Sequence, residues 1–114
     1  MDAILERLDI VLADVVEMGP FFQQSRGQQD GLQIDWMILR RDSVWTLLEI
    51  KYSASPQGRQ VIHDVERKIE RLQVPAGVTI EPALVSASGV TSAVKRDGFF
   101  SQVVELAELV ERKR

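Results

Sequence analysis

Two apolar runs separated by four polar residues constrain this chain more than any other feature of its sequence. Residues 32–39 read Leu-Gln-Ile-Asp-Trp-Met-Ile-Leu, and residues 44–52 read Val-Trp-Thr-Leu-Leu-Glu-Ile-Lys-Tyr. Both runs are rich in β-branched, aromatic and other apolar side chains, and the short polar link at residues 40–43 suits a hairpin. The sequence therefore predicts two adjacent strands near the middle of the chain.

The segments around this hairpin predict helices and further strands. In residues 3–18 the apolar side chains recur at steps of four and three, which predicts an amphipathic helix that ends at Gly19-Pro20. The other expected elements are a short strand at 21–25, a turn at 26–31, a helix over 55–72 and a buried strand over 80–86.

The C-terminal part of the chain is less clearly patterned. Residues 87–98 show little periodicity, and residues 99–104 suit either a strand or the start of a helix. Leu106, Leu109 and Val110 support a short C-terminal helix. The order of helix, three strands, helix and strand predicts one α/β domain over residues 1–114, with a small mixed sheet flanked by helices.

Composition excludes several kinds of site. The 114 residues include no cysteine, so disulfides, zinc-thiolate sites, iron–sulfur clusters and cysteine nucleophiles are excluded. His63 is the single histidine, which also excludes a multi-histidine metal site. No apolar run approaches the roughly 20 residues of a membrane span. The early charges of Asp2, Glu6 and Arg7 do not fit a signal peptide, so we expect a cytoplasmic protein.

The charge balance is mildly acidic. Fourteen Lys and Arg stand against 17 Asp and Glu, for a net charge of −3. Many dedicated nucleic-acid-binding proteins are strongly basic, so tight non-specific binding of DNA is disfavoured. A protein that gathers its basic groups on one face, or uses its acids to hold metal, stays compatible with this balance.

Three charged residues interrupt the two apolar runs. Glu49 and Lys51 are two residues apart on one predicted strand and therefore share a face, and the hairpin brings Asp35 near them. Two carboxylates on adjacent strands offer the hard oxygen ligands that Mg²⁺ or Mn²⁺ prefers. With a lysine beside them, they supply the parts needed for metal-assisted hydrolysis of a phosphodiester.

The alternative for these residues is a solvated strand face on which Glu49 and Lys51 form an ordinary ion pair. Residues 47–52 are otherwise largely apolar, and charges within a buried strand are costly unless they are paired or bound to metal. This context favours the functional interpretation.

Residues 31–41, read together with residues 48–53, resemble the PD-(D/E)XK nuclease superfamily, which has the restriction-endonuclease-like fold. The similarity lies in Gln33-Ile34-Asp35 and in the run Glu-Ile-Lys-Tyr-Ser that begins at Glu49. Within the superfamily, the pattern is closest to the C-terminal nuclease-like domain of a group of prokaryotic AAA-type ATPases. Ile34 stands where the motif names proline. The resemblance implies an αβββαβ core and metal-dependent hydrolysis of DNA phosphodiester bonds.

The resemblance also implies roles for individual residues. Asp35 and Glu49 would hold Mg²⁺ or Mn²⁺ together with the backbone carbonyl of Ile50, and Lys51 would be the catalytic lysine. Many members add an acid from the first helix, for which Glu6 is the candidate.

Glu17 is the alternative helical acid. The chain has no Walker-type phosphate loop, so the resemblance implies a free-standing or excised domain with an ATPase partner, or one once fused to an ATPase. A catalytically inactive domain that binds nucleic acid or docks a protein is the other interpretation.

Basic residues recur at four-residue steps in the predicted helix over residues 55–72. Arg59, Arg67 and Arg71, with His63 among them, form a ridge that could follow the phosphates of a nucleic acid. The alternative is a solvent-exposed helix face on which these basic residues pair with neighbouring acidic residues.

Two pairs of aromatic residues carry further predictions. Trp36 and Trp45 are predicted to be core or hairpin aromatics. Many nucleases of this fold cut duplexes as dimers, so a homodimer is possible, with Phe99-Phe100 as the candidate contact.

Overall fold

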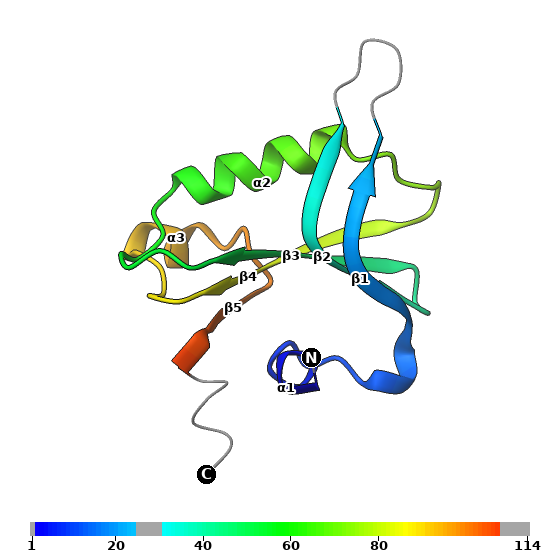
Figure 1. Ribbon diagram of the computed structural model, residues 1–114, viewed down its shortest axis with the longest axis horizontal. Helices are drawn as coiled ribbons and strands as arrows, with labels where there is room; N and C mark the ends of the chain where they lie inside the picture. The colour runs from blue at the N-terminus through cyan, green and yellow to red at the C-terminus, as the bar shows by residue number, and fades with distance from the viewer. Residues whose placement is uncertain (1, 25–30, 108–114) are drawn as a thin grey trace.

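The computed structural model describes residues 2–24 and 31–107, and the predicted central hairpin is present in it (Figure 1). Strand β2 (Leu32–Arg40) pairs antiparallel with β3 (Val44–Lys51) across the polar turn. Strand β1 (Val15–Gln23) pairs antiparallel with the outer side of β2. The hairpin therefore supplies two strands of a three-stranded antiparallel unit, with β2 in the middle.

Two parallel strands extend this unit on the other side. β4 (Thr79–Ser86) pairs parallel with β3, and β5 (Gln102–Glu105) pairs parallel with β4. Parallel neighbours need crossover connections, which here contain α2 (Gln60–Arg71) and α3 (Ser92–Asp97). The result is one mixed five-stranded sheet in the order β1-β2-β3-β4-β5.

Helices cover both faces of the sheet. α2 and α3 lie on one face, and α1 (Asp2–Arg7) lies on the other (Figure 1). Successive strand residues point to opposite faces, so Leu47 packs with the α2 side while Leu48 packs with the α1 side. The α/β class and the mixed sheet flanked by helices are confirmed.

The helix expected over residues 3–18 is wrong beyond its first turns. α1 ends at Arg7. Two residues later, Asp9 takes a left-handed conformation with φ of 61°. The Ile10 N–H donates to the Leu5 carbonyl at 2.8 Å, and the Asp9 N–H donates to the Glu6 carbonyl at 3.1 Å. These two bonds form a Schellman motif, which stops the helix.

The rest of that segment is the short 3₁₀ helix η1 (Leu12–Asp14) followed by β1. A register shift between Val15 and Glu17 marks a β-bulge, and Val15 and Met18 both pack on the α1 side of the sheet. The three-residue spacing of these two apolar side chains is also the spacing that one face of a helix would give. Pro20 is tolerated inside β1 because β1 is an edge strand with an irregular register beside that residue.

The remaining expectations were met in part. α2 begins at Gln60, five residues after the expected start of its helix, while β4 matches the expected strand closely. β5 confirms the strand alternative for the later residues of 99–104, and α3 occupies the weakly patterned segment. Most of the expected turn at 26–31, together with Leu109 and Val110 of the expected C-terminal helix, lies outside the described residues.

Aromatic residues contribute to the core. Trp45 packs on the α2 side with Phe21, and Trp36 packs on the α1 side, as predicted. Phe99 and Phe100 stack edge to face at 5.0 Å and pack into the core, where Phe100 is buried. Phe100 therefore has little surface to offer a dimer contact, whereas Phe99 is partly exposed. Among the described helices, none is long and apolar enough to cross a membrane.

Candidate metal and phosphodiester site

Strands β2 and β3 part at the position where the predicted charged residues lie. Their ladder ends with the pair Trp36 and Leu48. Beyond it β2 continues to pair with β1, and β3 continues to pair with β4 as far as Lys51. The two strands therefore separate while each stays anchored to another neighbour.

Asp35 is the first residue of β2 beyond the last ladder pair. Its Oδ2 accepts a hydrogen bond from the backbone N–H of Ile50 at 2.8 Å. β2 advances three residues, from Met37 to Ile34, while β1 advances two, so β2 carries one extra residue at this point. Such a bulge re-aims side chains, and here the Asp35 carboxylate bridges to the β3 backbone.

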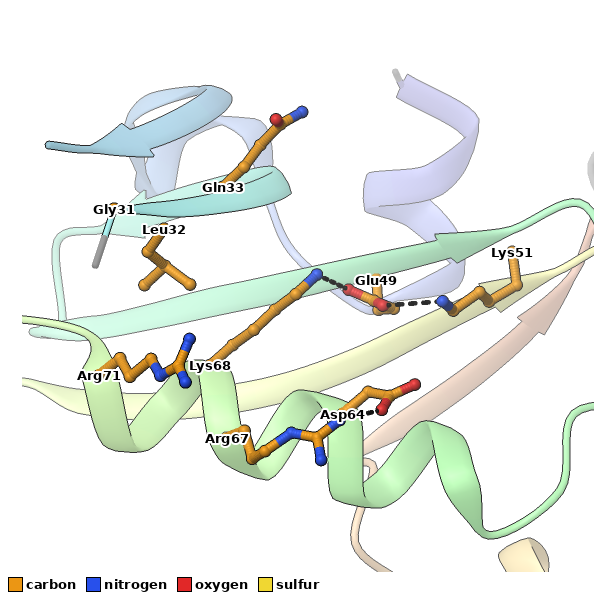
Figure 2. Close-up of a pocket in the computed structure, with 9 residues that line it drawn as sticks. All are labelled: Gly31, Leu32, Gln33, Glu49, Lys51, Asp64, Arg67, Lys68 and Arg71. Carbon is orange, nitrogen blue, oxygen red and sulfur yellow. Dashed lines mark hydrogen bonds and ion pairs between the residues drawn. The ribbon is translucent and has the colours of Figure 1, made fainter. Parts of the chain in front are cut away.

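Glu49 is a buried carboxylate between two ammonium groups. It is 2 % exposed and lies on the face of β3 that α2 covers. Its Oε2 lies 3.3 Å from Nζ of Lys51, and its Oε1 accepts a hydrogen bond from Nζ of Lys68 at 2.8 Å (Figure 2). A buried carboxylate is costly without counter-charges, and these two lysines supply them.

A cavity of about 310 Å³ opens beside Glu49, between the start of β2 and helix α2 (Figure 2). It is lined by Gly31, Leu32, Gln33, Glu49, Lys51, Asp64, Arg67, Lys68 and Arg71. The lining thus has four cationic side chains against two carboxylates. Asp64 is itself paired with Arg67 at 2.6 Å. The excess of positive charge suits an anionic ligand within the cavity itself.

The predicted basic ridge is divided by the structure. Arg67 and Arg71 line the cavity. Arg59 instead pairs with Asp97 of α3 at 3.6 Å and does not line the cavity. His63 contacts Glu66 on the same helix at 3.5 Å.

The two candidate acids from the N-terminal segment do not join the trio. Glu6 lines a separate hollow with Leu5, Ile10 and Leu12, on the α1 side of the sheet. Glu17 belongs to β1 and lines another hollow, beside Met18. Neither side chain lines the cavity beside Glu49: α1, which carries Glu6, lies on the opposite face of the sheet from α2, and Glu17 lies on the edge strand β1 instead of on a helix.

Two cavity residues, Lys68 and Asp64, were not singled out by the sequence analysis. Lys68 follows Val65 by three residues and precedes Leu72 by four, so it lies within the buried stripe of α2. A lysine at such a position signals a buried acidic partner. Asp64 precedes Val65, at the edge of this stripe, and is half-buried.

The donor set fits a small divalent cation. Asp35 and Glu49 offer carboxylate oxygens, and the Ile50 carbonyl adds a neutral oxygen of the same hard type. In residues 2–24 and 31–107 no three acidic, histidine or cysteine side chains gather into a metal-binding group. Mg²⁺ does not require three, since it commonly takes one or two carboxylates and completes its shell with waters and substrate phosphates.

Comparisons with known proteins support the fold. No protein-family profile matches the chain, and no curated protein matches it. Among solved structures it is similar to a repair endonuclease from Pyrococcus abyssi, with a TM-score of 0.53 and 16 % identity over 91 % of this chain. It is also similar to AF1548, a protein of unknown function, with a TM-score of 0.61 and 15 % identity over 85 % of this chain.

The chain spans 43 % of the length of the repair endonuclease and 57 % of the length of AF1548. At these identities the likeness shows the fold. The five-stranded mixed sheet flanked by helices is an endonuclease-like α/β fold.

Proposed function

We propose that this chain is a PD-(D/E)XK nuclease-like domain that hydrolyses DNA phosphodiester bonds with Mg²⁺ or Mn²⁺. The observation that carries the proposal is the 2.8 Å hydrogen bond from Ile50 to Asp35, at the point where β2 and β3 part. It joins Asp35 to the segment that holds Glu49 and Lys51. The likeness to a repair endonuclease supports the same assignment.

The proposed roles follow from the chemistry of each group. The carboxylates of Asp35 and Glu49 and the carbonyl of Ile50 would hold the cation, which when bound would supply a Lewis acid and an activated water. Lys51 contacts Glu49 and is about one-third exposed, so its ammonium can reach both the buried carboxylate and the cavity. There it can hydrogen-bond an anionic phosphate oxygen and stabilise the charge that develops on it.

The cavity gives the proposal a path for the substrate. Arg67 and Arg71 line it on the α2 side and can pair with phosphates of a DNA strand. The net charge of −3 means that this positive surface is local rather than general. An ATPase partner and a homodimer are further parts of the proposal that rest on the family resemblance. A cytoplasmic location is also proposed, on the sequence alone.

One observation favours a second candidate function. Both oxygens of Glu49 already contact lysine ammonium groups. If a metal ion never displaces those lysines from Glu49, the same cavity is a phosphate-binding or docking surface without hydrolysis. The two functions therefore differ in whether Glu49 binds a divalent cation.

Cleavage is tested on supercoiled plasmid and branched DNA with Mg²⁺ or Mn²⁺. We expect cleavage by the wild type, and loss of it in Asp35→Ala and in Lys51→Ala. Cleavage that survives both substitutions would indicate a contaminating nuclease. Absence of cleavage on every substrate, with DNA still bound, would favour the binding function.

Metal binding is tested separately by thermal unfolding with and without millimolar Mn²⁺. A cation that binds only the native state raises the melting temperature. We expect a rise in the wild type, no rise in Glu49→Gln, and a full rise in Glu66→Gln. Glu66 is an exposed acid on the same domain, so its substitution makes the same chemical change outside the cavity. An equal shift in Glu49→Gln would show that Mn²⁺ binds elsewhere.

A further inference from the structure

Lys68 reaches the buried carboxylate of the site from a different element. It belongs to α2, and its Nζ lies 2.8 Å from Oε1 of Glu49, closer than the 3.3 Å that separates Lys51 from Oε2. Its side chain is 27 % exposed and also lines the cavity. Lys68 is therefore in contact with both the buried acid and the space in which a substrate would lie.

We propose that Lys68 is a positioning residue that holds Glu49 in the metal-free protein and is displaced into the cavity when a divalent cation binds. The inference rests on the proposed function and deepens it. A dication and an ammonium group repel each other, and on this proposal they compete for the Glu49 carboxylate. Binding of the cation then breaks the contact between Lys68 and Glu49.

The structure provides a destination for the displaced ammonium group. Asp64 lies one helical turn before Lys68 on α2 and lines the same cavity. Arg67 contacts Asp64 through Oδ1. A lysine released toward Asp64 stays within the cavity and adds its charge to the surface that would meet a phosphate.

This exchange couples the two ligands. A DNA phosphate in the cavity attracts Lys68 away from Glu49 and so favours the cation, and the cation favours the phosphate in return. The arrangement restrains the carboxylate until both ligands are available. Lys68 also provides the counter-charge that the buried Glu49 carboxylate needs when neither the cation nor the phosphate is bound.

The test is the affinity for Mn²⁺, measured by titration calorimetry on the wild type, Lys68→Met and Arg71→Met. Methionine keeps the apolar stem of Lys68 and removes the competing charge. We expect Lys68→Met to bind Mn²⁺ about tenfold more tightly, the scale of one charge-assisted hydrogen bond. Arg71 lines the cavity but does not contact Glu49, so Arg71→Met should change the affinity less than about threefold.

Equal Mn²⁺ affinity in the wild type and Lys68→Met overturns the exchange and leaves the proposed function intact. An equal gain in Arg71→Met also overturns it, because the effect would then be general electrostatics. If neither the wild type nor Lys68→Met binds Mn²⁺, the proposed metal site itself fails, and the exchange fails with it.

A second measurement uses only the wild type and does not depend on the folding of a variant. Limited lysine acylation is followed by mass spectrometry with and without Mg²⁺. We expect Mg²⁺ to raise the labelling of Lys68 several-fold and to leave exposed Lys95 on α3 unchanged. Unchanged labelling of Lys68 at a Mg²⁺ concentration that raises the melting temperature would overturn the exchange.

Discussion

The carboxylate of Asp35 accepts a hydrogen bond from the backbone N–H of Ile50 at 2.8 Å, one residue beyond the last pair of the β2–β3 ladder. A side chain thus takes the place of a backbone carbonyl where the two strands separate. Oδ2 makes this bond. Asp35 therefore shapes the site, and under the proposed function it would also hold the cation.

Substitution of Asp35 separates these two roles. Asp35→Ala leaves the Ile50 N–H without its acceptor and should lower the free energy of unfolding by about 1–2 kcal/mol. Asp35→Asn keeps a carbonyl acceptor and should recover most of that stability, while Mn²⁺ binding is lost in both. Urea denaturation and the Mn²⁺ shift of the melting temperature check this. Equal destabilisation by the two variants would show that the hydrogen bond does not matter for stability.

The charge balance around Glu49 gives a prediction about stability that needs no metal. The double substitution Lys51→Met with Lys68→Met leaves a buried carboxylate without counter-charge and should cost about 3–5 kcal/mol. Addition of Glu49→Gln should restore most of this loss, because the uncompensated charge is gone. Urea denaturation of the wild type, the double variant and the triple variant measures both steps. A triple variant no more stable than the double variant would contradict this account.

Sequence reasoning predicted the centre of this fold well because each element carries a clear local signal: two β-forming runs with a short polar link in the hairpin, an apolar stripe in α2 and a short apolar run in β4. The hairpin also placed Asp35 near Glu49 and Lys51. The strand bulge that turns the Asp35 carboxylate toward Ile50 was not predictable, because it depends on pairing with β1. The contact between Lys68 and Glu49 was missed since it joins elements that are separate in the sequence, although a lysine in a buried stripe was a signal.

The N-terminal segment was misassigned for an identifiable physical reason. The bulge between Val15 and Glu17 places the partly buried side chains of Val15 and Met18 on the same side of the sheet, at a spacing that a helix would also give. The left-handed residue that ends α1 is Asp9 rather than glycine, so no stop signal was visible. Local period alone could not separate the two structures.

The two arginines in the cavity should contribute to DNA binding in a way that Arg59 does not. Each contact with a phosphate contributes about one unit to the slope of log affinity against log salt concentration. Arg67→Ala and Arg71→Ala should each lower that slope by about one and weaken binding at low salt. Arg59 pairs with Asp97 outside the cavity, so Arg59→Ala should leave the slope unchanged.

Fluorescence anisotropy on a labelled oligonucleotide at several salt concentrations, with EDTA to prevent cleavage, measures these slopes. An equal change in all three variants would mean that DNA follows the whole predicted ridge rather than the cavity. No change in Arg67→Ala and Arg71→Ala would remove the cavity as a DNA path.

The end of α1 gives a prediction whose sign depends on the fold. Asp9 is exposed and has φ of 61°, a conformation that glycine adopts at little cost and alanine does not. Asp9→Gly should therefore raise the free energy of unfolding by about 0.5–1 kcal/mol, and Asp9→Ala should lower it by about 1 kcal/mol. If the helix instead continued through residue 9 toward Met18, the order would reverse, because glycine is about 1 kcal/mol worse than alanine inside a helix. Urea denaturation of both variants beside the wild type decides between the two structures, and a more stable Asp9→Ala would contradict the Schellman ending of α1.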